Sequence, residues 1–411
     1  MDRLSSLKNS VTPTHSQNFV DSCVDYLNFP ELLSPEDEKL RKAVRQIAEN
    51  EIAPFINDSI ETASFPDHLL PVFKKHEILL HFLPPPYGKG TSLLGLGALT
   101  AELGRIDGSI CTFTLVSACL AMYTIDHLGS EAQKQKYLPA MGRLELISGW
   151  GLTEAKIGSD AGNLETSVTK VPGGYKLNGD KRWIGNGNKD MLIVWARNTE
   201  NKKVEGFILD MKSPGVTTQV IKHKLPLRMV QNCQINFNNV FLPDDSKLPK
   251  ANDFNKGTGA ILKHSRIFVC WAALGLAIGV YDNTIKFIMT RKQFGVPIAS
   301  FQLIQEKLSR IMGTVQAMLL LVWRITKLAE QNKATIGQIG MAKAWITLRG
   351  REVCALGREM LGGNGITFDN YVMKAMADME AMYTYEGTYD VNSLVNAREL
   401  TGIDAFRASK K

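Results

Sequence analysis

The chain has 411 residues, of which 44% are hydrophobic and 22% are charged. This composition excludes disordered and collagen-like chains, and the length predicts two or three domains with a large core. The net charge of +7 is spread along the chain without a basic run interleaved with aromatic residues, so we expect no nucleic-acid binding.

The cysteines and histidines show no metal-binding or disulfide pattern. None of the six cysteines forms a CxxC pair, and the seven histidines form no HExxH motif. We therefore expect no metal site, and a soluble protein of a reducing, intracellular compartment. No hydrophobic signal core precedes residue 30. The longest apolar run, residues 267–281, is shorter than the ~20 residues that span a bilayer, so no transmembrane segment is expected.

The two ends of the chain leave the compartment open. The N-terminus carries Arg3 and Lys8 but also Asp2, which is a weak match to a mitochondrial transit peptide. The C-terminal Ser409-Lys410-Lys411 differs in one residue from a peroxisomal address. The mitochondrial matrix and the peroxisome therefore remain alternatives.

The first third of the chain has helical patterns. Ser34 followed by Pro35 and acidic residues is typical of a helix start, and Pro54 is expected to bend or end that helix. Residues 93–103 and 111–128 are apolar enough for two further helices, and Ser130 forms a capping box with Gln133. We predict a flexible extension over residues 1–30 and a helical domain over residues 31–147.

The pattern changes from helix to strand at about residue 148. Pro172-Gly173-Gly174 separates two β-type runs and indicates a hairpin. Residues 191–196, 204–211 and 234–242 are further short β-type runs, the last with alternating polar and apolar residues. We predict a β-barrel or sandwich-like domain over residues 148–254.

The last third returns to helix. Four long periodic segments are separated by Gly, Pro or Asn: residues 262–291, 301–330, 335–361 and 390–401. Long helices with short breaks indicate an antiparallel four-helix bundle, predicted over residues 255–411. The predicted fold class is mainly α with a central β-domain.

Two segments of the β-domain are candidates for binding a cofactor. Residues 150–160 are dense in small and hydroxyl residues, which can offer N–H groups and hydroxyls to a phosphate or a ring. The alternative is an ordinary surface loop. Trp183 stands between Arg182 and a glycine, and the alternative there is a tryptophan packed between sheet and bundle.

Two segments of the helical bundle are further candidates. Residues 291–295, Arg-Lys-Gln-Phe-Gly, follow a helix, and their alternative role is a basic C-cap with Gly at the left-handed position. Glu386 lies between tyrosines, where desolvation raises the pKa of a carboxylate and makes it a usable base. Its alternative is a solvated acid, with Thr388 or Asp390 capping the next helix.

The order of the domains and of these segments resembles the acyl-CoA dehydrogenase and acyl-CoA oxidase superfamily over nearly the whole chain. The motifs are Leu-Thr-Glu…Gly-Ser-Asp at 152–160, Trp-Ile-x-Asn at 183–186, Arg-x-Gln-Phe-Gly at 291–295, Leu-Gly-Gly-Asn-Gly at 361–365 and Tyr-Glu-Gly-Thr at 385–388. Within the superfamily the chain looks most similar to the glutaryl-CoA dehydrogenase branch, which includes plant-type short-chain acyl-CoA oxidases.

The resemblance implies FAD as cofactor and oxidation of an acyl-CoA thioester to the 2,3-enoyl-CoA. Glu386 matches the base that removes the α-proton while the β-hydrogen leaves as hydride to flavin N5. Arg266, Tyr385, Gly387, Cys111 and Ser159 match the substrate side. The positions that match the cofactor side are Leu152, Thr153, Ser159, Trp183, Ile184, Gly185, Arg291, Gln293, Phe294, Gly362, Gly363 and Thr388.

Two departures from the family pattern bear on the substrate and the electron acceptor. Gly185 stands where dehydrogenases usually place a threonine that bonds flavin N5, and acyl-CoA oxidases often have Gly there. Cys111 stands where glutaryl-specific enzymes place an arginine. A buried distal carboxylate would then lack a partner, so a short, neutral acyl chain is expected.

The family also implies the partners and the alternatives. A dehydrogenase of fatty-acid β-oxidation or amino-acid catabolism would pass electrons to an electron-transfer flavoprotein, and an oxidase would pass them to O2 and form hydrogen peroxide. A glutaryl-CoA dehydrogenase and a catalytically silent structural homologue are the remaining alternatives. Because Arg291, Gln293 and Phe294 match residues that reach a neighbouring subunit's FAD, a homo-oligomer, tetramer or dimer, is expected.

Overall fold

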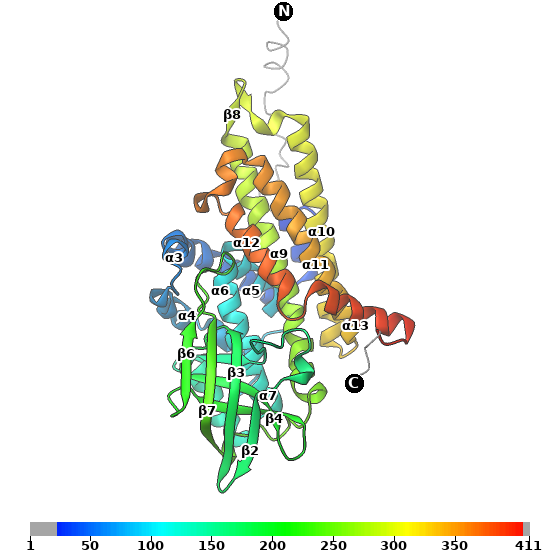
Figure 1. Cartoon of the computed structure of the whole chain (residues 1–411). Helices are drawn as coiled ribbons and strands as arrows, with labels where there is room; N and C mark the ends of the chain where they lie inside the picture. The colour runs from blue at the N-terminus through cyan, green and yellow to red at the C-terminus, as the bar shows by residue number, and fades with distance from the viewer. Residues whose placement is uncertain (1–22, 406–411) are drawn as a thin grey trace, which may run out of the picture.

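A computed structural model describes residues 23–405 of the chain. The sheet lies at one end of the molecule, the long helices extend away from it, and the N-terminal helices pack beside their junction (Figure 1). The order of helical domain, β-domain and helical bundle is as predicted from the sequence.

The N-terminal part is helical. Its elements are α2 (Pro35–Ile47), α3 (Ile56–Thr62), α4 (Leu70–Lys75), α5 (Leu93–Ile106), α6 (Gly108–Thr114), the π-helix η7 (Leu115–Met122), α7 (Tyr123–Leu128) and α8 (Glu131–Gly142). The Ser34 side chain accepts from the Asp37 amide at 3.1 Å, and the capping box of Ser130 and Gln133 is present. The α-helix ends at Ile47 and is followed by a π-helical turn over Ala48–Ile52, shortly before Pro54, where the sequence predicted a bend or an end.

The predicted extension overlaps with ordered structure. Two short 3-10 helices, η1 (Cys23–Asp25) and η2 (Phe29–Leu32), precede α2, and Phe29 is buried. The Gln316 side chain donates to the carbonyl oxygen of Cys23 and ties this segment to the bundle. The prediction for residues 1–22 lies outside the described residues.

The middle part is one curled sheet. Its strands are β1 (Ser148–Gly151), β2 (Ser167–Val171), β3 (Gly174–Ile184), β4 (Met191–Asn198), β5 (Val204–Asp210), β6 (Val216–Val220) and β7 (Cys233–Pro243). The order is β1-β4-β2-β3-β7-β6, with β5 paired to β4. The predicted hairpin at residues 172–174 joins β2 and β3. The inward side chains of six strands form a core of their own.

The C-terminal part is a bundle of long helices. Its helices are α9 (Ala260–Thr290), α10 (Gln302–Glu330), α11 (Ile336–Met360), α12 (Val372–Thr384) and α13 (Tyr389–Thr401), with a small hairpin of β8 (Lys292–Gln293) and β9 (Val296–Pro297). The sequence patterns did not predict α12, which packs against α9 and α11 as the fourth helix of the bundle. The predicted fourth helix, α13, packs mainly on α11.

Within residues 23–405, three helical segments are long and apolar enough to cross a membrane by length and composition: Gly108–Leu128, Asn255–Thr290 and Gln302–Glu330. The most apolar windows of the first two are 89% and 83% buried against the rest of the chain, and that of the third is 44% buried. Burial against the rest of the chain accounts for the apolar character of the first two, one in the N-terminal helical part and one in the bundle. The absence of a transmembrane segment stays a prediction.

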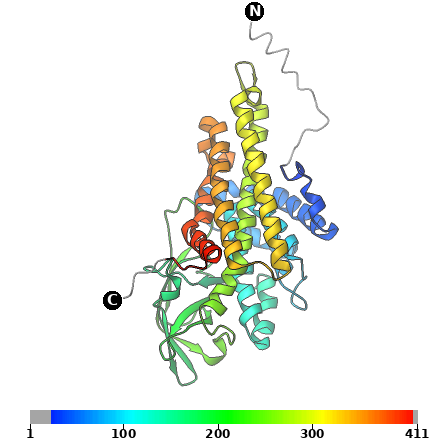
Figure 2. The same cartoon turned by 90° about the vertical axis from the view of Figure 1, so that its right-hand side faces the viewer.

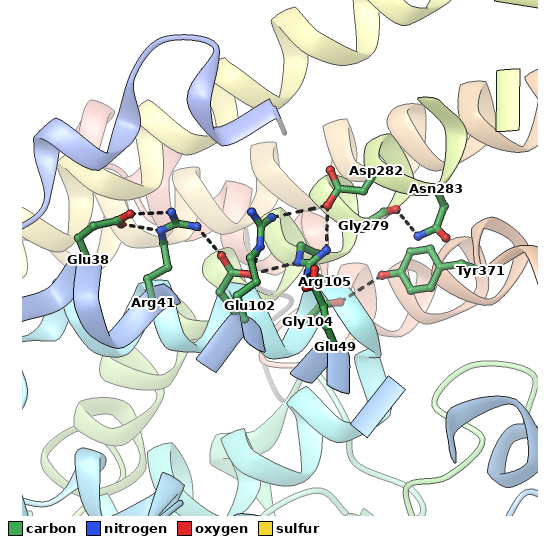
Figure 3. A network of polar contacts seen from close by, with 11 residues as sticks. Glu38, Arg41, Glu49, Glu102, Gly104, Arg105, Gly279, Asp282, Asn283 and Tyr371 are labelled. Atoms are coloured by element: carbon green, nitrogen blue, oxygen red, sulfur yellow. Dashed lines mark hydrogen bonds and ion pairs between the residues drawn. The ribbon is translucent and has the colours of Figure 1, made fainter. Parts of the chain in front are cut away.

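A buried ionic network joins the N-terminal helices to the bundle (Figure 3). Glu102 of α5 accepts from Arg41 at 2.8 Å and from Arg105 at 3.0 Å. Arg105 also donates to Asp282 of α9 at 2.9 Å. Side chains of α2 and α5 therefore meet at the Glu102 carboxylate, which is 4% exposed, and Arg105 extends the network to α9, so that the two domains are fixed to each other there.

Candidate active site

Glu386 lies in the short loop between α12 and α13. Its backbone has φ of 56°, in the left-handed region that non-glycine residues rarely adopt. The Ser265 hydroxyl donates to Oε2 of its carboxylate at 2.6 Å, and Arg266 Nε donates to its carbonyl oxygen at 2.8 Å. Two residues at the start of α9 therefore hold the side chain and the backbone of the predicted base.

The next residue, Gly387, cannot carry a side chain without strain. Its φ is 89°, and an added Cβ would lie 2.9 Å from Asn392 Nδ2 and 3.2 Å from a guanidinium nitrogen of Arg266. Its carbonyl oxygen accepts from Lys343 Nζ and from Asn392 Nδ2, both at 2.7 Å. Glycine thus permits the close approach that fixes the loop.

The electrostatic surroundings of Glu386 suit a base. Burial raises the pKa of its carboxyl group, while the hydrogen bond from Ser265 and the charges of Arg266 and Lys343 oppose the rise. Burial lowers the pKa of the Lys343 ammonium to about 7. A carboxylate whose pKa is raised by burial is a stronger proton acceptor than a solvated one, which suits the removal of a proton from a carbon acid.

The π-helix η7 connects the base to the sheet. At one side, Val116 and Ser117 meet β3 and its following turn: an added Cβ at Gly185 would lie 3.3 Å from Val116, and Asn186 Nδ2 donates to Ser117 at 3.2 Å. Further along η7, burial raises the pKa of the Cys119 thiol, and the nearby Cys111 and Glu386 add to the rise. The sheet edge at residues 183–186 and Glu386 therefore both lie near this helix.

The sheet side presents the features expected of a flavin-binding face. Trp183, with φ of 66°, is 51% exposed at the end of β3, so it is not the core tryptophan of the alternative interpretation. Among the described residues, the hydroxyls of Thr153 and Ser159 make no hydrogen bond within the chain. The Arg182 guanidinium lies over the Trp183 ring, 5.0 Å from its centroid. An exposed aromatic side chain and free hydroxyls in the same domain fit a planar ring that carries polar groups. Ile184, by contrast, is buried within the sheet core.

A buried ion pair between Lys181 and Glu154 holds the loop that carries Leu152 and Thr153. Lys181 Nζ donates to Glu154 Oε1 and to the carbonyl oxygen of Leu152, both at 2.9 Å. Glu154 also accepts from the amides of two residues that precede β2. Burial lowers the pKa of the Lys181 ammonium to about 8. This pair fixes the loop at its predicted cofactor-binding residues.

Cys111 and Tyr385 come together on the substrate side. Cys111 is fully buried, and its thiol donates to the carbonyl oxygen of Thr100 at 3.5 Å. Burial raises the pKa of the Tyr385 hydroxyl, and the neighbouring Cys111 adds to the rise. The Thr112 hydroxyl lies near that of Tyr385 and partly opposes the rise in its pKa. The two hydroxyls are not aligned well enough to form a hydrogen bond. Tyr385 therefore links Glu386 to the predicted substrate position at Cys111.

A second group of predicted residues lies at the far end of the bundle. Arg291 follows α9, roughly 37 Å beyond Arg266 along the helix axis at about 1.5 Å per residue. Gln293 and Phe294 form the β8–β9 hairpin at that tip, where Phe294 is 80% exposed (Figures 1 and 2).

Gly362 and Gly363 belong to the same end of the bundle. They follow α11, whose last turns are tied to the start of α10 by an ion pair of Lys307 with Glu359 at 3.3 Å. An added Cβ at either glycine would meet nothing within 4 Å. One chain therefore does not bring this group to Glu386. Thr388 remains beside Glu386, where its hydroxyl caps α13.

Sequence reasoning did not find Ser265, Lys343 or the role of Lys181. Ser265 directly precedes Arg266 in an apolar helix, and only the contact across 121 residues identifies it. Lys343 is fully buried inside α11. A buried lysine in a helical pattern is rare without a partner, but the partners here are backbone carbonyls, which carry no sequence signal.

Family models match all three parts of the chain. The N-terminal domain of acyl-CoA dehydrogenases matches residues 34–145, the middle domain residues 149–240 and the C-terminal domain residues 256–401. The chain belongs to the acyl-CoA dehydrogenase family. The predicted resemblance and the fold class are thereby confirmed, and the enzyme class is that of CH–CH oxidoreductases.

Individual relatives span nearly the whole chain. An acyl-CoA dehydrogenase of Bacillus subtilis (strain 168) is 29% identical over 90% of this chain and 99% of its own length. The crystal structure of glutaryl-CoA dehydrogenase from Mycobacterium smegmatis is 30% identical, with a TM-score of 0.90 over 94% of this chain and 100% of that one. A glutaryl-CoA dehydrogenase from Mycobacterium smegmatis solved in complex with FADH2 is 29% identical, with a TM-score of 0.91 over 94% of this chain and 100% of that one. Butyryl-CoA dehydrogenase from Megasphaera elsdenii is 25% identical, with a TM-score of 0.85 over 90% and 98%.

Proposed function

We propose that this acyl-CoA dehydrogenase family member uses FAD to oxidise a short, neutral acyl-CoA to the 2,3-enoyl-CoA. The observation that carries the proposal is the buried carboxylate of Glu386 near η7, the same helix that packs against Gly185 next to the half-exposed Trp183. A base on one side and a planar cofactor on the other is the arrangement that α,β-oxidation requires.

The residues of the chain then have distinct tasks. FAD, when bound, supplies the hydride acceptor. Glu386 accepts the α-proton of the thioester on its carboxylate. The amide N–H of Glu386 donates to no protein group in the described structure, so it is available to polarise the thioester carbonyl as negative charge develops there. Arg266 and Lys343 hold the loop through backbone carbonyls while this happens.

The acyl end of the site favours a neutral chain. Cys111 is buried there, and the cation that acts on it, Lys374, is already paired with Asp107 and Asp378. A distal carboxylate at Cys111 would therefore lack a free cationic partner, and burying an unpaired charge is costly.

We therefore expect butyryl-CoA and hexanoyl-CoA to be oxidised with a kcat/KM at least about tenfold above that of glutaryl-CoA. Steady-state rates with an artificial electron acceptor measure this preference. Cys111→Ala is the matched variant, because it enlarges the site without adding charge and is expected to keep the preference for neutral chains. A preference of the wild-type enzyme for glutaryl-CoA would contradict the proposal that the site at Cys111 excludes a charged acyl end.

Two electron acceptors remain as candidates. The dehydrogenase route passes electrons to an electron-transfer flavoprotein. Gly185 supports the oxidase alternative, because it offers no side-chain hydroxyl to the flavin. The space beside Gly185 is nevertheless narrow, since an added Cβ would lie 3.3 Å from Val116 and 3.5 Å from Val230. Admission of air to the substrate-reduced enzyme separates the routes: fast reoxidation with peroxide indicates an oxidase, and slow reoxidation indicates a dehydrogenase.

We further propose that the FAD site is completed by a second copy of the chain. The hairpin with Arg291, Gln293 and Phe294 is too far from Trp183 of its own chain to share a ligand with it. In a homo-oligomer the exposed hairpin of one subunit would meet the cofactor of the other. Arg291 then supplies a charge-assisted contact to a phosphate.

Arg291→Ala is expected to weaken FAD binding by roughly 10- to 100-fold, as expected for a lost hydrogen bond of a charged group. The dissociation constant is measured from flavin fluorescence after FAD removal and readdition. Lys292→Ala, in the same exposed hairpin, is the control and is expected to bind FAD as the wild type does. Equal FAD affinity of the Arg291→Ala variant and the wild type would contradict the shared site.

A further inference from the structure

We propose that Ser265 is a positioning residue that holds Oε2 of Glu386 and leaves Oε1 as the oxygen that takes the α-proton. The proposal rests on the proposed function, because it concerns the same carboxylate. It adds a residue that the sequence motifs do not contain.

The geometry assigns the hydroxyl proton of Ser265 to the carboxylate. Ser265 is 3% exposed, and its Oγ lies 2.6 Å from Glu386 Oε2 but 3.4 Å from the carbonyl oxygen of Leu262. A hydroxyl has one proton to donate, and 2.6 Å is the length of a strong bond to an ionised acceptor. The longer contact to Leu262 is too weak to compete for that proton.

Among the described residues, no other side chain donates a hydrogen bond to this carboxylate. Arg266 Nε donates to the backbone carbonyl of Glu386, and Lys343 Nζ donates to the carbonyls of Tyr383 and Gly387. Arg266 and Lys343 therefore fix the loop and attract the carboxylate electrostatically, but neither forms a hydrogen bond to Oε1 or Oε2 of Glu386. Ser265 therefore determines the rotation of the carboxylate about its last bond.

The groups that face Glu386 come from four elements. Arg266 and Lys343 contribute positive charge from α9 and α11, while Cys119 of η7 and the preceding Tyr385 are neutral at physiological pH. The two cations keep their contacts to the loop when Ser265 is removed. A change caused by removing Ser265 can therefore be attributed to the hydroxyl.

The test is the pH dependence of flavin reduction by butyryl-CoA in the FAD-loaded enzyme, followed by stopped flow. Loss of the donor destabilises the ionised form of Glu386, so its pKa rises and the acid limb of the rate profile moves to higher pH. For Ser265→Ala we expect a shift of about one pH unit. We also expect a fall of about tenfold in the rate on the high-pH plateau, where Glu386 is ionised but less well oriented.

Two further variants separate positioning from folding. Ser265→Thr keeps the hydroxyl and is expected to restore the wild-type profile. Ser265→Cys keeps a side chain of similar size with a weak donor, and is expected to shift the acid limb in the same direction as alanine. The cysteine variant gives the answer if the alanine variant does not fold. Ser246→Ala, which removes a buried hydroxyl bonded only to the carbonyl of Pro243, is the matched control and is expected to leave the profile unchanged.

An unchanged acid limb and plateau in both Ser265→Ala and Ser265→Cys would overturn the proposal. A wild-type enzyme that no acyl-CoA reduces would instead contradict the proposed function. The two failures are thus distinguishable, because the second is seen before any variant is made.

Discussion

Glu386→Gln is expected to keep bound FAD and to reduce the rate of flavin reduction by acyl-CoA by about 10²- to 10⁴-fold or more, the contribution of a positioned base. The amide has nearly the same shape as the carboxylate and still accepts from Ser265, so the loop should keep its conformation. It cannot take up the α-proton. Stopped-flow measurement of flavin reduction under anaerobic conditions gives the rate directly.

Glu380→Gln is the control for this variant. Glu380 lies on α12, the helix that leads to the catalytic loop, and forms an exposed ion pair with Arg351 at 2.7 Å. Its neutralisation should leave flavin reduction close to the wild-type rate. Near wild-type reduction in the Glu386→Gln variant would show that another group is the base.

Glu102→Gln is expected to lower the free energy of unfolding by about 3–5 kcal/mol, the cost of removing one partner from a buried ionic cluster. The substitution leaves Arg41 and Arg105 buried without the carboxylate that both contact. Because Arg105 also reaches Asp282 of α9, the junction between the N-terminal helices and the bundle should loosen. Urea unfolding followed by circular dichroism measures the effect.

The matched control is Glu51→Gln. Glu51 also contacts two basic side chains, Lys75 at 3.0 Å and His76 at 2.7 Å, but it is only partly buried. Removing an ion pair that solvent screens is expected to leave the free energy of unfolding nearly unchanged. Equal losses in the two variants would mean that the buried network does not hold the domains together.

Local signals predicted those helices and turns whose ends carry caps. Ser34, Ser130 and the Pro172-Gly173-Gly174 turn all act as their residue types suggest. The helix α12 has no side-chain cap at its start, and the residue that precedes it, Tyr371, has φ of 52°.

Buried charges also obscured the pattern of α12. Its inward face carries Lys374 and Asp378, which are buried as an ion cluster with Asp107. Charges on a buried face hide the apolar period on which the prediction depends.

Some residues of the candidate active site could be predicted from the sequence, and others could not. Residues within short motifs, such as Glu386 and Trp183, could be chosen because their types are unusual in their local surroundings. Ser265 and Lys343 act through contacts between distant segments, and these contacts are set by the packing of α9 and α11 on the loop. Single residues of that kind have no local pattern, so only the structure assigns them.

We expect the purified protein to carry FAD, and we expect butyryl-CoA to bleach the visible flavin absorbance under anaerobic conditions. An anaerobic titration that follows this absorbance is the most direct test. We expect bleaching to be complete near one equivalent of butyryl-CoA per flavin, with glutaryl-CoA much less effective. A colourless protein that takes up no FAD, or bound FAD that no short-chain acyl-CoA reduces, would contradict the proposed acyl-CoA oxidation.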